Sequence, residues 1–263
     1  MIDELRDMKD PNKYNVRAVE RALLILDCFD SENPERGITD IAQVVGLHKA
    51  TAHRIVTTLV NYGFLERAAD GQKYRLGLEL ANLGFKVIRR MNLRREALPY
   101  MKQLVQEWDE TCDLSVFDQD KVFYVEVLRG AHALTIAATV GQRLPAHCTA
   151  SGKLFLAYLP SAELDPILNQ PLESFTDHTI TSRDALLEQF EIVRDQGYSV
   201  DYEEFEVGIC AVAAPIFNRW GKVIAAIGCP FPTSRMAPER IIQIAESFKE
   251  TAQAISHRMG YDL

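Results

Sequence analysis

Apolar residues recur every three or four positions near the start of the chain, and this spacing predicts three short helices. The first lies in 16-VRAVERALLILDCFD-30 and is followed by turn formers in SENPERG. The second is expected to take Thr39 as its N-cap and to end at Gly46. The third covers residues 49–60, and its apolar stripe consists of Ala52, Ile55, Val56 and Leu59.

A different pattern follows the third helix. Residues 64–67 and 73–76 are predicted strands on either side of 68-AADGQ-72, in which Asp-Gly is a strong hairpin signal. A further helix is expected over residues 77–92, with leucines on one side. Three helices and a hairpin, with a short Gly-containing turn between the second and third helices, are the elements of a winged helix-turn-helix.

The rest of the chain alternates between the two periods. It predicts a helix ending near Trp108, two strands within residues 113–130, a third strand over 132–141, and helices at 149–159, 161–168 and 183–196. Two more strands, 209–217 and 222–229, precede a closing helix over 238–259. Hairpin-linked strands with helices between and after them predict an α+β domain on a mostly antiparallel sheet. The expected division is therefore 1–77, 78–92 as a connecting helix, and 93–263.

Length and composition agree with two globular domains. The chain has 263 residues, of which 47% are hydrophobic and 25% charged. No apolar run reaches membrane-spanning length, and the N-terminus is too polar and acidic for a signal peptide, so we expect a cytoplasmic protein that does not bind a membrane. Five widely spaced cysteines without a C-x-x-C pair predict buried free thiols, with no disulfide framework and no metal site.

Charge is distributed unevenly along the chain. The net charge is −8, yet residues 36–92 carry 9 basic and 4 acidic side chains, and no Asp or Glu occurs between Ile41 and Leu65. Residues 93–263 carry 15 basic and 24 acidic side chains. A local basic surface on an acidic protein indicates double-stranded DNA as a partner of the first part.

The third helix is expected to enter the major groove, with its apolar stripe against the core. Its outer face offers donors and a methyl group that suit base edges and phosphates, with Arg54 as the main candidate. Two basic residues of the hairpin are expected to lie along phosphates. The predicted DNA-binding residues are Lys49, Thr51, His53, Arg54, Thr57, Lys73 and Arg75. A dimer is expected, because one short helix reads too few base pairs for useful specificity.

Several motifs together resemble the IclR (isocitrate lyase regulator) family of bacterial transcription regulators. They are R-A-x-x-R-A-L-L-I-L, I-T-D-I-A-Q-V-V-G-L-H-K-A-T-A-H-R-I-V-T-T-L, G-F-L-E-R and Y-R-L-G, then V-G-Q-R-L-P-A-H-C-T-A-S-G-K, G-Y-S-V-D-Y-E-E-F-E-x-G-I and A-A-P-I-F-N-x-x-G-K-V-I-A-A-I. The resemblance covers nearly the whole chain. It implies an N-terminal winged helix-turn-helix, a connecting helix used in dimerisation, and a C-terminal GAF-like domain that binds a small effector, in a homodimer or tetramer. No large apolar stripe is evident outside the connecting helix, so the sequence leaves dimer and tetramer open.

The segment 141-GQRLPAHCTASGKLFLAYL-159 is the best candidate for small-molecule binding. A loop runs into a helix at about Thr149, whose first N–H groups, with the Ser151 hydroxyl, are suited to an anion such as a carboxylate. The alternative is a capped helix whose small residues allow close packing. By position in the family, the resemblance implies an effector pocket lined by Ile136, Leu144, Ala150, Ser151, Asp201, Ile209, Ala211 and Gly228, to which we add Thr149.

Small residues at Ala211 and Gly228, and 229-CPFP-232 where members often have Ser-rich strand ends, depart from the family pattern. They predict fewer polar groups and more room, and so a larger or more apolar acid, such as an aromatic carboxylate, than a two-carbon acid. Glu203 and Glu206 are interpreted as a solvated acidic loop.

An enzyme with a basic appendage is the alternative from another class, with Ser151 or Cys148 as nucleophile and His147 as base. The P-loop, S-x-x-K, G-x-S-x-G and H-E-x-x-H patterns are all absent from the sequence. Adjacent residues on a strand point to opposite faces, which counts against His147 and Cys148 as a catalytic pair. We therefore assign no catalytic residue and no cofactor. A third possibility is an adaptor that keeps the sensor domain and does not bind DNA.

Overall fold

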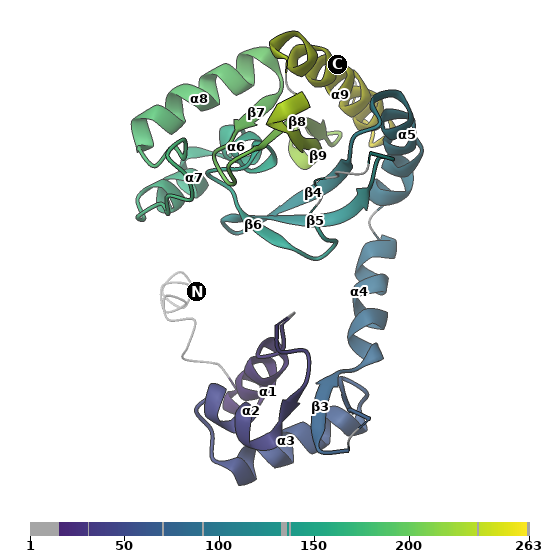
Figure 1. The fold of residues 1–263 in the computed structure, drawn as a ribbon, viewed down its shortest axis with the longest axis vertical. Helices are drawn as coiled ribbons and strands as arrows, with labels where there is room; N and C mark the ends of the chain where they lie inside the picture. The colour runs from purple at the N-terminus through teal and green to yellow at the C-terminus, as the bar shows by residue number, and fades with distance from the viewer. Residues whose placement is uncertain are drawn as a thin grey trace, which may run out of the picture. The chain divides into compact units, whose positions relative to one another are not determined.

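The computed structural model describes residues 16–30, 32–69, 71–90, 92–132, 136, 138–235 and 237–261. The chain forms two compact units, one ending at Arg90 and the other beginning at Met91. They are described one at a time, and Figure 1 labels their helices and strands.

The first unit is a three-helix domain with a small sheet. Its elements are α1 (Arg17–Asp27), β1 (Arg36–Gly37), α2 (Ile38–Val44), α3 (Lys49–Asn61), β2 (Leu65–Arg67), β3 (Lys73–Leu76) and α4 (Leu78–Arg90). The sheet is antiparallel in the order β1-β3-β2. Ile25, Ile41, Val56, Leu65 and Tyr74 form much of its buried core, so the three helices and the hairpin are confirmed.

The start of α2 differs from the prediction. Its N-cap is Gly37, and the backbone N–H of Gly37 donates to the Asp40 carboxylate at 3.3 Å. Thr39 was expected as the N-cap and instead lies inside the helix. The two-residue strand β1 was not predicted, because its only signal is pairing with β3, where Arg36 faces Tyr74.

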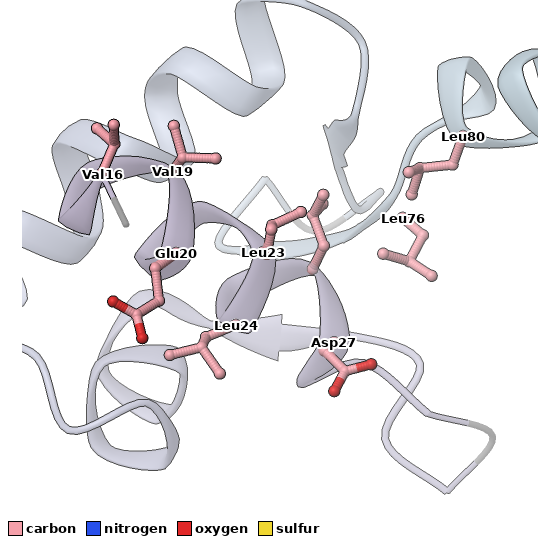
Figure 2. Close-up of a pocket in the computed structure, with 9 residues that line it drawn as sticks. Val16, Val19, Glu20, Leu23, Leu24, Asp27, Leu76 and Leu80 are labelled. Carbon is pink, nitrogen blue, oxygen red and sulfur yellow. The ribbon is translucent and has the colours of Figure 1, made fainter. Parts of the chain in front are cut away.

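One face of α1 carries apolar side chains that the first unit does not cover. Val16, Val19, Leu23 and Leu24 expose 64%, 57%, 60% and 49% of their surface. With Leu76 and Leu80 they line an open groove of about 580 Å³ (Figure 2). The expectation that no large apolar stripe lies outside the connecting helix was wrong here, because helical spacing of apolar residues does not show which of them the rest of the unit covers.

The second unit is built on one six-stranded antiparallel sheet. Its helices are α5 (Asn92–Trp108), α6 (Ala150–Ala157), α7 (Ser161–Leu168), α8 (Arg183–Gln196) and α9 (Pro238–Arg258), with a 3₁₀ turn at Thr233–Arg235. Its strands are β4 (Cys112–Asp118), β5 (Lys121–Leu128), β6 (Arg143–Pro145), β7 (Ser199–Tyr202), β8 (Ile209–Phe217) and β9 (Val223–Pro232), in the order β6-β5-β4-β9-β8-β7.

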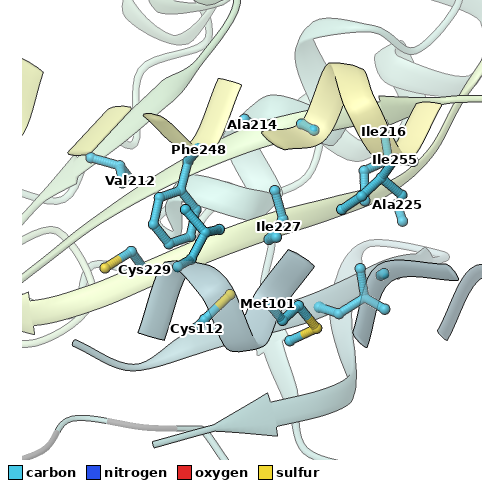
Figure 3. Close-up of a cluster of buried hydrophobic side chains, with 14 of the residues drawn as sticks. Met101, Cys112, Val212, Ala214, Ile216, Ala225, Ile227, Cys229, Phe248 and Ile255 are labelled. Carbon is cyan, nitrogen blue, oxygen red and sulfur yellow. The ribbon is translucent and has the colours of Figure 1, made fainter. Parts of the chain in front are cut away.

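Both faces of this sheet are covered by helices. On one face, α5 and α9 contribute Met101, Phe248 and Ile255 to a core that includes Leu114 and Ile227 from the strands (Figure 3). On the other face, α6 packs on the sheet in a core that includes Tyr124, Ala213 and Ala226, and α8 packs against α6. Because strand side chains alternate between faces, the neighbours of Leu114 and Ile227 point toward α6.

Three expectations for the second unit need correction or extension. A strand was predicted over 132–141. Residues 133–135 and 137 lie outside the described residues, and the described remainder of that segment is not in a strand. The strand at this edge is β6, which pairs with β5 through Leu144 and Val122. Strand β7 was not predicted. Strand β9 continues beyond the predicted end to Pro232, because Pro232 pairs with Ile209 of β8. The antiparallel sheet and the other predicted helices and strands are confirmed.

None of the described helices is long and apolar enough to cross a membrane. All five cysteines are buried and unpaired, as their spacing predicted.

Candidate functional site

The outer surface of α3 collects the candidate DNA-binding side chains. The turn before α3 contains Gly46 at φ +64°, a left-handed conformation that favours glycine. The buried positions of α3 are Ala52, Val56 and Leu59. Of the candidates, Lys49, His53, Arg54 and Thr57 are exposed and Thr51 is half-buried. All five thus lie outside the buried stripe, with Arg54 on the opposite side of α3 and Thr51 at the edge of the stripe.

The two basic side chains of the hairpin are not equivalent. Lys73 and Arg75 are exposed, and Tyr74 between them is buried. However, Arg75 lies 2.6 Å from Glu66 and 3.9 Å from Glu35. Within the described part of the chain, Arg54 makes no such ion pair. A phosphate approaching Arg75 must compete with two carboxylates, whereas Arg54 is available.

The nine predicted effector-binding residues surround one cavity in the second unit. The cavity has a volume of about 130 Å³. It is lined by Ile136, Leu144, Thr149, Ala150, Ser151, Asp201, Ile209, Ala211 and Gly228 and also by Asp113, Tyr124, Ala138, Gln142, Phe205, Glu206, Val212 and Pro230. The segments that supply these residues are far apart in sequence, and the sheet and α6 bring them together.

One wall of the cavity is the N-terminus of α6. Thr149 is the N-cap in an extended conformation, and its hydroxyl donates to the Pro145 carbonyl at 2.8 Å instead of capping the helix. A side chain at Gly152 would overlap the backbone of Ala146, so this glycine allows the helix to start close to the loop. Within the described residues, the N–H groups of Ala150 and Ser151 have no acceptor. They are therefore available to an anion.

Two buried carboxyl groups lie on the cavity floor. Asp113 in β4 and Asp201 in β7 each expose 4% of their surface. Burial raises the pKa of each to about 7, and for Asp201 a hydrogen bond from the Glu204 backbone N–H, at 2.8 Å, acts in the opposite direction. Asp113 Oδ1 has no hydrogen-bond partner among the described residues. The cavity is therefore more polar than the small residues at 211 and 228 led us to expect.

The turn between β7 and β8 closes one side of the cavity and is attached to its surroundings. It carries Phe205 and Glu206, and exposed Glu206 lies on the cavity rim as well as in solvent. The buried Lys153 ammonium of α6 donates to the Val200 carbonyl at 2.7 Å and pairs with the buried Glu204 carboxylate. The Thr176 and Thr179 hydroxyls donate to the backbone carbonyls of residues 203 and 204, at 2.6 Å each.

The groups named in the enzyme alternative are poorly arranged for catalysis. Burial raises the pKa of the Cys148 thiol to about 12, so it is protonated at neutral pH. His147 Nε2 donates to the Glu173 carbonyl at 2.8 Å, which occupies it away from a nucleophile. In the described ranges, no group of three His, Cys, Asp or Glu side chains is placed to hold a metal ion.

The sequence analysis missed Asp113, Tyr124, Gln142 and Phe205. Asp113 had a readable signal, because in 112-CDLSV-116 it alternates with residues of a buried strand and so points to the opposite, α6-facing side. Gln142 lies in the candidate segment 141–159 but was not singled out there, and the positions of Tyr124 and Phe205 depend on loop and strand placement.

Both units match known protein-family models. Residues 18–69 match the IclR helix-turn-helix domain, and residues 85–257 match the model described as bacterial transcriptional regulator IclR C-terminal.

Whole-chain relatives agree with the family matches. The HTH-type transcriptional regulator XynR of Escherichia coli (strain K12) is 35% identical over 247 residues, covering 94% of this chain and 98% of the relative. KdgR of the same strain is 34% identical over 253 residues, with 96% of each chain covered. A solved IclR homologue from Microbacterium hydrocarbonoxydans, complexed with 4-hydroxybenzoate, aligns with TM-score 0.83 and 30% identity over 92% of this chain and 99% of its own. These relatives are similar along their whole lengths.

Proposed function

Because this chain belongs to the IclR family of bacterial transcriptional regulators, with a helix-turn-helix DNA-binding domain and an effector-binding C-terminal domain, we propose which of its residues carry those two activities. It is a DNA-binding regulator and not an enzyme. The single observation that supports the assignment best is that the exposed side of α3 is basic and free of acidic residues. The cavity at α6 supports an effector site in the second unit.

In this proposal α3 lies in the major groove. Arg54, with Lys49 and His53, donates to base edges or phosphates, while the Thr51 and Thr57 hydroxyls and methyl groups complete the surface. Lys73 and Arg75 lie along the phosphates flanking that groove. Arg75 contributes less than Arg54, because Glu66 and Glu35 already neutralise it in part.

The first test is fluorescence anisotropy of the purified protein on DNA from upstream of its own gene, across a salt series. We expect sub-micromolar, salt-sensitive binding that exceeds binding to random DNA. Arg54→Ala is expected to lower the affinity by about 1–3 kcal/mol and to relax sequence preference. Arg75→Ala is expected to have a smaller effect and to change the salt slope by less than the value of about 0.9 for one full phosphate contact.

The matched control is Arg219→Ala, because Arg219 belongs to the second unit, at the β8–β9 turn beside Trp220. It should leave DNA affinity unchanged. Equal loss for Arg54→Ala and Arg219→Ala would argue against the assignment of α3, and no binding by the wild type at low salt would overturn the DNA-binding role itself.

The proposed effector is a small organic acid. Its carboxylate would accept from the Ala150 and Ser151 N–H groups at the start of α6, which have no other acceptor within the described residues. Leu144 and Ile209 supply apolar contact, and Asp201 and Thr149 supply polar contact. A solved relative that holds 4-hydroxybenzoate supports an acid that carries more than two carbons, and an aromatic carboxylate is one such candidate.

The proposed assembly is a homodimer or a tetramer built from dimers. A second copy of the chain covers the α1 groove, since two reading helices are needed for a paired site and the groove exposes a row of apolar side chains. Effector binding then changes the affinity for operator DNA, and linkage requires the reverse effect to be equal.

A further inference from the structure

The second unit contains a hollow that is separate from the effector cavity. It measures about 220 Å³ and lies where the β4–β5 turn, β6, α7 and the segment after α7 meet, and we call it the α7 hollow. Its lining includes Asp120, Lys121, His147, Ile167, Glu173 and Phe175. Among the described residues, it shares no lining residue with the effector cavity. A molecule in the α7 hollow would therefore leave the effector cavity free.

The segment between β6 and α6 separates the two cavities. Thr149 lines the effector cavity, whereas Pro145 and His147 line the α7 hollow. Hydrogen bonds hold this segment in place, because the Thr149 hydroxyl donates to the Pro145 carbonyl at 2.8 Å and the Ala146 backbone N–H donates to the Asp120 carbonyl at 3.1 Å. The two cavities therefore lie on opposite sides of one fixed segment.

A buried histidine supplies the α7 hollow with a hydrogen-bond acceptor. His147 exposes 7% of its surface, and its Nε2 donates to the Glu173 carbonyl at 2.8 Å. In the neutral ring this bond places the proton on Nε2 and leaves Nδ1 as an acceptor. Nδ1 has no hydrogen-bond partner among the described residues, and unlike Asp113 Oδ1 it is not one of the polar atoms that lack both a partner and contact with solvent. A ligand with a donor group therefore has a partner in the buried wall of the hollow.

The charged side chains around the α7 hollow are of both signs. Asp120, Lys121 and Glu173 are exposed, and within the described part of the chain none of them makes an ion pair. Lys121 is the register partner of Pro145 and so belongs to the side formed by the sheet. Glu173 follows α7, and its carbonyl accepts from His147. A ligand in the hollow therefore meets one ammonium group and two carboxylates that are available for pairing.

An apolar wall completes the α7 hollow. Phe175 exposes 36% of its surface, and its ring centroid lies 6.0 Å from that of His147 and 5.1 Å from that of Phe205. Ile167 and Leu172 also line the hollow and are half-buried. An apolar group of a ligand that covers these side chains removes them from water, which favours binding.

The acceptor, the charges and the apolar wall together define the chemical class of the ligand. A plain carboxylic acid pairs with Lys121 but leaves His147 Nδ1 and two carboxylates without donors. A plain amine supplies donors but no anion for Lys121. A zwitterion supplies both, and about 220 Å³, the volume of about seven water molecules in the liquid, leaves room for a medium-sized apolar side chain.

We propose that the α7 hollow is a second ligand site of this protein and that it binds an α-amino acid with an apolar side chain. The ammonium group of the ligand donates to His147 Nδ1 and Glu173, and its carboxylate pairs with Lys121. The apolar side chain covers Phe175 and Ile167. This inference goes beyond the proposed function, because it concerns another cavity and does not depend on which molecule binds at α6.

The test is isothermal titration of the full-length protein with L-leucine, L-methionine and L-phenylalanine. The matched probes are 3-methylbutylamine, 3-(methylthio)propylamine and 2-phenylethylamine, which lack only the carboxylate, and glycine, which lacks the apolar side chain. We expect at least one of the three amino acids to bind at least about fivefold more tightly than its amine and than glycine, because the amine loses a charged contact and glycine loses apolar burial.

Two variants locate the binding in the α7 hollow. Lys121→Met removes the partner of the carboxylate and Glu173→Gln removes the charge that faces the ammonium group, and each should weaken that amino acid by at least about fivefold. The matched controls are Lys102→Met and Glu107→Gln at exposed positions of α5, which packs on the opposite face of the sheet. Both controls should bind as the wild type does. Thermal unfolding of each variant shows whether it is folded.

The proposal is overturned if none of the three amino acids binds, if the amines or glycine bind as tightly as the amino acids do, or if Lys121→Met or Glu173→Gln leaves the affinity unchanged. Equal losses in the α5 controls would also overturn it, since the effect would then follow net charge instead of the hollow. The anisotropy of the wild type on upstream DNA tests the proposed function separately, so the two fail independently.

Discussion

Asp113 lines the cavity and carries a penalty in folding. Its carboxyl group is buried beside Gly228, and burial raises its pKa to about 7. An acid whose pKa is higher in the folded than in the unfolded state stabilises the fold at low pH and loses that contribution as pH rises through the folded-state pKa. The buried carboxyl group of Asp113 should therefore reduce stability at neutral and alkaline pH.

The variant Asp113→Asn tests this penalty. Asparagine has nearly the same shape as aspartic acid and does not ionise. The variant therefore lacks the loss of unfolding free energy that ionisation of Asp113 causes between pH 4 and pH 7. Relative to the wild type, the unfolding free energy of the variant should rise by about 2–3 kcal/mol between pH 5 and pH 8, because one pKa unit corresponds to about 1.36 kcal/mol. Denaturant unfolding at both pH values measures this change.

Asp201 titrates over the same range, and its contribution cancels because both proteins retain it. Parallel pH profiles for the two proteins would contradict the raised pKa of Asp113. A variant that is more stable and binds the effector less tightly would show a site maintained at the expense of stability.

At the residue level, the motifs predicted which residues lie together around one cavity, and they did not predict which neighbour lies across the sheet. The eight residues from Ile136 to Gly228 that the resemblance implied line one cavity, and so does Thr149. The polarity of the cavity was misjudged, because Gly228 was considered without its register partner Asp113. A single sequence gives strand alternation and leaves strand pairing undetermined.

At the scale of elements, a buried ion pair connects α6 to the turn between β7 and β8. Lys153 and Glu204 are both buried, and the turn carries Phe205 into the cavity wall. Separate elements are thereby held at the positions that line the site. Removal of one partner of a buried pair leaves an uncompensated charge, whereas removal of both can be nearly neutral.

The variant Lys153→Met should lower the unfolding free energy by about 3–5 kcal/mol and weaken effector binding, because the turn loses its attachment to α6. The double variant Lys153→Met with Glu204→Leu should recover much of the stability. Arg183→Met is the control, since it breaks an exposed pair with Asp165 and should change stability by about 0–1 kcal/mol. If the single and double variants lose equal stability, the pair does not hold the turn.

Helices and long strands were predictable because their periodicity is local. The helix α3 and the strands β4, β5 and β8 follow their apolar patterns closely. The errors fell on short elements and ends. β1 and β7 have two and four residues and depend on a partner strand, and α2 takes its cap from Gly37 and Asp40 instead of Thr39.

At the scale of the whole molecule, the proposed function requires two reading helices and a change in their affinity on effector binding. Taken by itself, the first unit leaves an apolar row exposed along α1 and its N-cap, made of Val16, Val19, Leu23 and Leu24. A second copy of the chain can cover this row. Burial of such side chains contributes roughly 25 cal/mol per Å². A charge placed in this row would lose that contribution and add the desolvation of an ion.

The variant Leu23→Glu therefore should dissociate the dimer of the DNA-binding units at micromolar concentration. We expect its affinity for a paired operator site to fall toward that of a single unit. The loss of affinity should appear mainly as faster dissociation from the operator. Light scattering measures the mass of the protein in solution. Fluorescence anisotropy measures its affinity for the operator. The control is Val44→Glu, which adds the same charge at an exposed apolar position on α2 outside the groove and should leave the mass unchanged.

Two other results would change the interpretation of the α1 groove. If Leu23→Glu keeps the wild-type mass but loses cooperative operator binding, the second unit holds the copies together and the α1 groove pairs only the DNA-binding units. If both mass and operator affinity are unchanged, the groove is not an interface. A third result bears on regulation. If an acid that binds the cavity shifts operator affinity in the wild type and no longer does so in Leu23→Glu, the pairing of the α1 faces transmits the coupling, since an effector can change DNA affinity only through a state that both ligands bias.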